Sequence, residues 1–327
     1  MDINQPLNEN ILQDFFASQL ADWDLARTNV EALKTQVVTR RIPYGEIQLQ
    51  VQFNPARIVS TGAKVDKKSI AQRACFLCAD HRPAVQQEIE ILDNISVLLN
   101  PFPILPSHLT IPSRAHVPQQ IGLFEKSIGQ LAEMLPSHII FYNGPRCGAS
   151  APDHAHLQAG AKGYVPIERD WATYQTNLEL LYSQSAHTSF VGGADISLVH
   201  HYACPAFAVQ SDTAEMNAIL LHRLTRTICQ VTSVDEADIN VLTWKYYGRL
   251  VTVVFVRSKH RPDCYTAEGD AQILVSPGSI DMGGLFITPR QEDFNRLTPQ
   301  KAYDILREVS ATEEVFETIS TQITNWD

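Results

Sequence analysis

The sequence predicts an α+β fold built mainly from antiparallel sheet, with helices set between groups of strands. Apolar side chains alternate with polar ones from Ile47 to Phe53, which is the period of a half-buried strand, and Asn54-Pro55 ends this stretch. Apolar residues recur at helical spacing from Asn10 to about Lys34, and Asn8 or Asn10 could cap that helix. Grouped strand patterns with segregated helical patterns are typical of α+β proteins.

Further elements follow along the chain. Short apolar runs predict strands over residues 95–99, 105–111, 138–142, 154–158, 238–244, 250–256, 273–276 and 285–288. Helical spacing predicts helices over residues 121–135, 215–231, 299–310 and 313–323. The polar, basic stretch before Cys75 predicts a loop. We expect a catalytic half over residues 1–170 and a second half over residues 171–327, with a soft boundary between 170 and 210.

Composition limits the kinds of protein that the chain can be. Its 327 residues are 44% apolar, which suits one large core or two smaller ones. The sequence shows no leader pattern and no run of about 18 uncharged apolar residues. We therefore expect a cytoplasmic protein without a membrane span. The formal net charge of −10 disfavours nucleic-acid binding, whereas a small phosphorylated substrate needs only a local basic pocket.

The most informative segment runs from Phe141 to Gln158. Side chains two residues apart share one face of a strand, so we expect His154, His156 and Gln158 to project together into one pocket. A neutral imidazole that donates from one ring nitrogen presents the other as a nucleophile, which suits attack on phosphorus. An isolated His-x-His pair has plainer uses, as a structural pair or a simple metal site.

The residues before the two histidines suit a phosphate. Gly148, Ala149 and Ser150 could offer consecutive backbone N–H groups and a hydroxyl to phosphate oxygens, and Gln158 could donate its amide to the same group. We therefore expect Gln158 and Ser150 to be catalytic together with one of the two histidines, and Gly148 and Ala149 to contact substrate.

This segment, a Gly-Ala-Ser followed by His-x-His-x-Gln, resembles the active-site motif of the transferase branch of the histidine triad superfamily. That branch includes galactose-1-phosphate uridylyltransferase, diadenosine tetraphosphate phosphorylase and GDP-galactose phosphorylase. The resemblance implies a histidine triad-like fold with two related halves. It also implies that His156 forms a nucleotidyl-histidine intermediate and that Gln158 steadies its phosphate. Histidine triad hydrolases carry a third histidine in place of Gln158, so the glutamine favours transfer or phosphorolysis.

The resemblance extends over most of the chain. The segments Cys75–Cys78, Asn100–His108 and Ser113–His116 occur in the order seen in that branch. Asn240–Trp244 and Arg257–Lys259 look like the C-terminal half of the phosphorylases, although these motifs are less specific.

A structural zinc site is a further expectation. A Cys-x-x-Cys turn supplies two ligands from one loop, here Cys75 and Cys78. The resemblance implies His116 and His154 as the other two, with His108 as the alternative third ligand. The plainer interpretation is a pair of buried thiols. Asp153, just before His154, departs from several relatives and could hydrogen-bond a histidine or only shape the turn.

Substrates with two or more phosphates need several cationic donors. The candidate phosphate contacts are Arg57, Lys64, Arg257 and Lys259. The resemblance implies that Asn100 and Asn143 could hydrogen-bond ribose or phosphate, although they could also simply hold turns.

Together these observations predict a nucleotidyltransferase or phosphorylase with a ping-pong mechanism. Its substrates would be a nucleotide sugar or a dinucleoside polyphosphate, together with a phosphate acceptor; base and sugar are left open, as is a homodimer. Two alternatives differ in kind. A zinc-dependent phosphoester hydrolase would use both His154 and His156 as ligands, and a non-catalytic nucleotide-binding module would never be covalently labelled.

Overall fold

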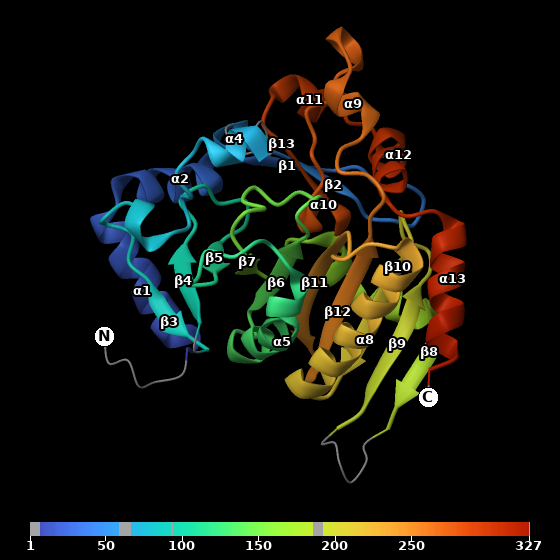
Figure 1. The fold of residues 1–327 in the computed structure, drawn as a ribbon. Coiled ribbons are helices and arrows are strands. Elements are labelled where there is room, and N and C mark those ends of the chain that lie inside the picture. Colours follow the sequence, from blue (N-terminus) through green and yellow to red (C-terminus); the bar gives the residue numbers. More distant parts are fainter. Residues whose placement is uncertain (1–6, 59–66, 93, 186–191, 327) are drawn as a thin grey trace.

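A computed structural model describes residues 7–58, 67–92, 94–185 and 192–326 (Figure 1). Its centre is a ten-stranded sheet in which every neighbouring pair is antiparallel, in the order β3-β4-β5-β7-β6-β11-β12-β10-β9-β8. The first five strands are β3 (Ile89–Ile91), β4 (Ile95–Leu99), β5 (Leu109–Pro112), β6 (His138–Asn143) and β7 (His156–Ala161). The others are β8 (Leu178–Gln184), β9 (Ala194–Val199), β10 (Ala206–Ser211), β11 (Ile239–Tyr246) and β12 (Arg249–Val256).

The two halves of this sheet have the same topology. Each half has three strands, a helix and then two strands, and in both the last two strands swap order beside the third. The helices are α5 (Glu125–Met134) and α8 (Ala214–Thr232), which pack against each other. The antiparallel pair β6–β11 joins the halves, so the predicted α+β fold with two related halves is confirmed. The predicted boundary near residue 170 lies between β7 and β8 and stays a prediction.

Both faces of the sheet are covered, which explains the nearly continuous apolar runs in its central strands. On β12, Val254 and Val256 point into the core beneath α5, α8 and α13 (Glu313–Thr324). Val253 and Phe255 point into the core on the opposite face. Alternate side chains of one strand therefore serve two separate cores.

A second sheet spans the two ends of the chain. It contains β1 (Val38–Arg41), β2 (Gln50–Phe53) and β13 (Leu285–Thr288), with β13 parallel to β2. The helices around it are α10 (Ser279–Met282), α11 (Gln291–Arg296) and α12 (Pro299–Val309). The N-terminal arm thus crosses over the C-terminal half, as Figure 1 shows in blue and orange.

The remaining elements are short or lie at the N-terminus. The helices are α1 (Glu9–Asp22), α2 (Asp24–Thr35), α4 (Lys67–Ala71), α6 (Pro166–Arg169), α7 (Trp171–Tyr174) and α9 (Asp263–Thr266). Single 3-10 turns are η1 (Pro55–Arg57), η2 (Ala79–His81), η3 (Ile121–Leu123), η4 (Gln175–Asn177) and η5 (Gly269–Ala271). Within the described ranges, no helix has the length and apolar character needed to cross a membrane.

The structure corrects several predicted elements. The single helix over residues 10–34 is two helices, because Trp23 has an extended backbone and is buried between them. Asn8 is the cap and accepts from two backbone N–H groups. The segment 273–276 is irregular, and the expected loop before Cys75 contains α4. Strands β8 to β10 were not predicted.

A buried polar network holds the two halves together at the β6–β11 pair. The amide of Asn240 donates to Asn143 Oδ1 at 2.9 Å and to the carbonyl of Cys147 at 2.7 Å. The buried Arg257 guanidinium donates to Asn240 Oδ1 and, at 2.9 Å, to the carbonyl of Pro277. One asparagine therefore connects both halves to the chain that leads into α10.

Replacing Asn240 by leucine should destabilise the protein strongly, because it leaves buried donors and acceptors unsatisfied. We expect a loss of about 3 kcal/mol in the free energy of unfolding. Chemical denaturation measures this, with the exposed Asn295→Leu as control. Equal stabilities of the two variants would contradict the role of the network.

Candidate active site

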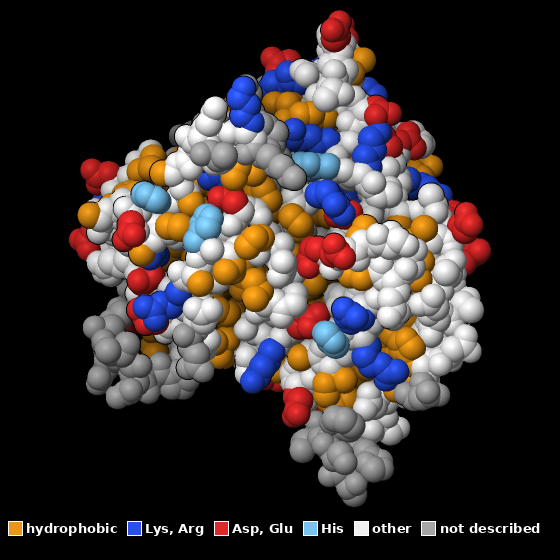
Figure 2. Space-filling model, viewed as in Figure 1, with side chains coloured by type: hydrophobic (Ala, Val, Ile, Leu, Met, Phe, Trp, Pro, Cys, Tyr) orange, Lys and Arg blue, Asp and Glu red, His pale blue; other side chains and the backbone are white. Residues whose placement is uncertain are grey.

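A cleft of about 860 Å³ opens beside the C-terminal side of β6 and the start of β7. Its lining comes from distant parts of the chain: the β4–β5 and β6–β7 loops, the segment after β12, and the turn into α10. Basic side chains gather between α4 and α12 in the upper part of the face drawn in Figure 2. Although the protein is acidic overall, basic side chains gather on the part of its surface between α4 and α12.

His156 is the first residue of β7 and is 3% exposed. Its Nδ1 donates to the carbonyl of His154 at 2.8 Å, which leaves Nε2 as the ring nitrogen with the lone pair. His156 lines the cleft. The pKa of His156 is lowered to about 4, mainly by burial and to a smaller extent by the nearby His154, whereas the hydrogen bond to the His154 carbonyl and the charge of Asp153 oppose the shift. The imidazole is therefore neutral at physiological pH.

Gln158 lies two residues further along β7 and also lines the cleft. The backbone N–H of Ile104 donates to His108 Nδ1 at 3.2 Å, so the proton of this neutral ring is on Nε2. Burial, together with the charge of Arg57, lowers the pKa of His108 to about 3. His108 Nε2 then donates to Gln158 Oε1 at 3.0 Å. This bond fixes the amide so that its NH₂ group is the part left to donate.

Gly148, Ala149 and Ser150 line the cleft as expected. Gly148 has a φ of +93°, and a Cβ there would lie 2.9 Å from Gly278 Cα and 2.9 Å from the carbonyl oxygen of Pro277. Both the backbone conformation and the close approach require glycine. The turn into α10 therefore packs directly against the Gly-Ala-Ser segment.

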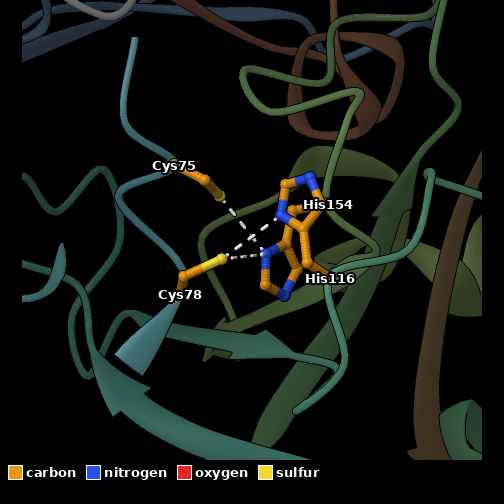
Figure 3. A group of neighbouring side chains, drawn as sticks. All are labelled: Cys75, Cys78, His116 and His154. Carbon is orange, nitrogen blue, oxygen red and sulfur yellow. Dashed lines mark hydrogen bonds between the residues drawn. The ribbon is translucent and has the colours of Figure 1, made fainter. Parts of the chain in front are cut away.

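Four side chains predicted as zinc ligands converge beside the cleft: Cys75, Cys78, His116 and His154 (Figure 3). Their ligand atoms all lie within 4.8 Å of one another. The Sγ–Nδ1 distances are 3.3 Å for Cys75 with His154, 3.2 Å for Cys78 with His116 and 3.5 Å for Cys78 with His154. Sulfur and nitrogen ligands of a tetrahedral zinc ion are separated by about 3.5 Å, so the donor set fits this metal.

The surroundings of the cluster also suit a metal. His154 Nε2 donates to the carbonyl of Ser113 at 2.8 Å, which leaves Nδ1 facing the thiols. Asp153 lies 4.0 Å from His116 Nε2 and forms an ion pair with Arg73 at 2.9 Å. Burial raises the pKa of Cys75, but the hydrogen bond with His154 and those from backbone amides outweigh it and lower the pKa to about 6.

The structure separates the two histidines that the sequence placed on one face. β7 begins only at His156, and His154 lies in the preceding bend with its ring in the cysteine cluster. His154 is not among the residues that line the cleft. The expectation of two imidazoles in one pocket is therefore wrong, because the strand starts two residues late. His108 is likewise absent from the cysteine cluster and contacts Gln158 instead.

The structure places the predicted phosphate contacts in different surroundings. Arg57 lines the cleft, and although burial lowers its pKa to about 10, it stays cationic. Arg257 is buried in the network at the joint between the halves, and Lys259 forms surface ion pairs with Asp263 and Glu308, so the structure places neither in the cleft lining. Lys64 lies outside the described residues.

The two asparagines have structural contacts as well as positions in the cleft. Asn100 donates to Thr110 Oγ1 at 2.9 Å and accepts from the Phe102 N–H at 2.9 Å, which holds the β4–β5 turn. Asn143 accepts from Asn240 and from the backbone N–H of Ser279. Both line the cleft.

Sequence reasoning missed several residues of the site. Arg73 precedes the cysteine pair and Phe76 lies within it, with the guanidinium 5.0 Å from the ring centroid, and both line the cleft. His260 and Arg261 reach it from the segment after β12. The remaining one, Gln119, has hydrogen bonds to the backbone of His156. None has a spacing that singles it out in the sequence.

Comparison with known proteins identifies the fold. The crystal structure of yeast Ap4A phosphorylase has a TM-score of 0.54 and is 16% identical, over 88% of this chain and 94% of that chain. Its complex with AMP has a TM-score of 0.55 at 15% identity, over 90% and 96% of the two chains. No curated protein sequence matches. The chain therefore shares the fold of this phosphorylase, as its α+β architecture with a large antiparallel sheet also indicates.

Family models match the two parts of the chain separately. Residues 179–326 match a model described as the GDPGP1-like C-terminal domain, and residues 15–161 match a domain of unknown function, DUF4922. The two matched ranges are separated by residues 162–178, which run from the end of β7 to the start of β8.

The protonation state of His156 is testable without substrate. We expect the ring to stay neutral, with the proton on Nδ1, from pH 8 down to about 5, because its folded pKa is about 4. The unfolded chain binds the proton at about pH 6.5, so this group makes the free energy of unfolding fall as pH drops from 6.5 to 4. Nitrogen-15 NMR of the ring is the measurement; a titration midpoint above 6 would contradict the assignment.

Proposed function

We propose that this protein is an enzyme that transfers a nucleoside monophosphate through a covalent nucleotidyl-His156 intermediate. The observation that carries the proposal is the neutral, oriented His156 ring in the wall of the cleft, with Nδ1–H bonded to the His154 carbonyl. The shared fold supports it: the yeast protein is an Ap4A phosphorylase, and its structures include complexes with Ap4A and with AMP. A nucleotide is therefore the substrate class that we assign.

The reaction has two displacements at the α-phosphorus. In the first, His156 Nε2 forms a bond to phosphorus, and the bond to the leaving phosphate or sugar-phosphate oxygen breaks. The ring becomes cationic, and its Nδ1–H bond to a carbonyl stabilises that charge. In the second, an oxygen of the acceptor attacks, the N–P bond breaks, and His156 returns to its neutral state. The acceptor is inorganic phosphate or a phosphorylated sugar.

Other side chains of the cleft have matching roles in this scheme. The NH₂ group of Gln158 and the backbone of Gly148–Ser150 would donate to the non-bridging oxygens as charge develops. Arg57 and Arg261 supply positive charge for the remaining phosphates. These assignments rest on position in the cleft and on chemistry.

The alternatives fit the geometry less well. A hydrolase with zinc on both His154 and His156 needs both rings on one metal, but only His154 faces the cysteines. A non-catalytic binding module gives no reason for an imidazole held in a single tautomer inside a cleft.

Intact-protein mass spectrometry tests the intermediate. Incubation with nucleotide sugars, dinucleoside polyphosphates and nucleoside triphosphates should add one acid-labile nucleoside monophosphate to the wild type. His156→Ala should show no such gain and lose at least about 1000-fold in turnover. The surface variant His222→Ala is the matched control and should be labelled normally. Labelling of His156→Ala would refute the mechanism, and the mass added identifies the base.

We further propose that Cys75, Cys78, His116 and His154 bind a structural zinc ion, in keeping with a cytoplasmic, reducing environment. All six cysteines are unpaired thiols. When bound, the metal would supply a cross-link between the Cys75–Cys78 loop and the segment before β7, and the chemistry at phosphorus stays with His156.

Metal analysis of the purified protein should find about one zinc per chain. Cys78→Ser should abolish it and lower the melting temperature, because binding a structural ion stabilises the folded state. Cys229→Ser, a cysteine outside the cluster, should keep the metal. Full zinc content in Cys78→Ser would rule out the site.

A further inference from the structure

Gln119 precedes η3 and is 1% exposed. Both the oxygen and the nitrogen of its side-chain amide form hydrogen bonds with the backbone around His156. Oε1 accepts from the His156 N–H at 2.7 Å, and Nε2 donates to the His156 carbonyl at 2.9 Å and to the Asn143 carbonyl at 2.8 Å. Its own N–H donates to the carbonyl of Pro152 at 3.0 Å, which ties this residue to the β6–β7 loop.

These hydrogen bonds lie just beyond the point where the pairing of β6 with β7 ends. β6 and β7 pair from His138 with Ala161 to Phe141 with Gln158, and two residues further along the same register would bring Asn143 opposite His156. That pairing is not formed, because the chain between the two residues carries the Gly-Ala-Ser segment and the bend at His154. The Gln119 amide stands between them and bonds to both.

The other neighbour of β7 cannot replace these bonds. Pro112 of β5 is opposite His156 and has no backbone N–H. The Ser113 N–H donates to the Ala155 carbonyl at 2.9 Å, and hydrogen-bonded pairs alternate along an antiparallel ladder. The peptide groups of His156 therefore face away from β5, toward the position of Gln119.

We propose that Gln119 is a positioning residue for the nucleophile. By holding the N–H and the carbonyl of His156, it sets the direction in which the ring leaves the backbone and keeps Nδ1 within bonding distance of the His154 carbonyl. The nucleophile needs this side chain because it sits at the first residue of its strand, where the ladder to β6 has already ended. This inference rests on the proposed function.

The hydrogen bonds at position 119 require an amide side chain. The side chain must accept one hydrogen bond and donate two, which neither leucine nor an ionised glutamate can do. A glutamate in this position would face two carbonyl oxygens in a buried site, and both factors raise the pKa of its carboxyl. When protonated, it can donate one bond and accept the other.

The test is the single-turnover rate of nucleotidyl-enzyme formation over a series of donor concentrations. For Gln119→Leu we expect the limiting rate to fall about 100-fold, since small misplacements of a reacting group cost this much. The donor concentration at half-maximal rate should change by about threefold or less. At pH 8 the limiting rate of Gln119→Glu should equal that of Gln119→Leu. As the pH is lowered toward 5, the limiting rate of Gln119→Glu should rise relative to that of the wild type.

Gln19→Leu is the matched control. Gln19 is fully buried, and its amide also bridges two backbone groups, donating to the Val85 carbonyl at 3.1 Å and accepting from the Gln87 N–H at 3.0 Å. It is not among the residues that line the cleft. This variant should lose stability as Gln119→Leu does, while its limiting rate stays within about twofold of wild type.

The outcomes are distinct. A limiting rate near wild type in folded Gln119→Leu, or equal rate losses in Gln119→Leu and Gln19→Leu, would overturn the inference and leave Gln119 a structural residue. If Gln119→Leu does not fold, Gln119→Glu decides: a pH profile parallel to wild type also overturns it. Failure of the wild type to be labelled by any donor would instead refute the proposed function itself.

Discussion

The hydrogen bond from His156 Nδ1 to the carbonyl of His154 is the interaction on which the site depends. It spans only two residues, so it would have little effect in a flexible chain. Burial makes it decisive, because a ring removed from water keeps its proton on the nitrogen that has an acceptor. The same burial lowers the pKa of the ring to about 4 and preserves the lone pair on Nε2.

That carbonyl has to be held in place, and contacts to His154 and to its neighbour His156 both contribute. The ring of His154 lies between the two thiols and the Ser113 carbonyl, which fixes the residue from its side chain. The amide of Gln119 fixes the backbone of His156 from the β6 side. The cysteine cluster and the His156 ring are therefore separate sites that share one short stretch of backbone.

The repeated topology explains how one cleft draws on the whole chain. Joining the halves through β6 and β11 places Asn143 opposite Asn240, and Arg257 then fixes the turn before α10. Gly148 packs against that turn. Arg257 was predicted as a phosphate contact, but its buried position makes it part of the joint. Its sequence context, a basic residue at the end of a strand, is the same for either role.

Much of this protein could be predicted from the order of its residues. Periodicity and ligand chemistry are local properties, and they predicted the α+β class, the strands β4, β6, β11 and β12, the helix α8 and the cysteine pair. The two histidines of the cluster followed from the family resemblance. Three features were not predictable: the turn of His154 away from the cleft, the break at Trp23 and the role of Arg257. Burial and strand register arise only from contacts between distant segments. The sequence by itself determined which side chains are candidates for the chemistry. The tertiary structure decided which of them face the cleft, because β7 starts at His156 and the ring of His154 is therefore turned away from it.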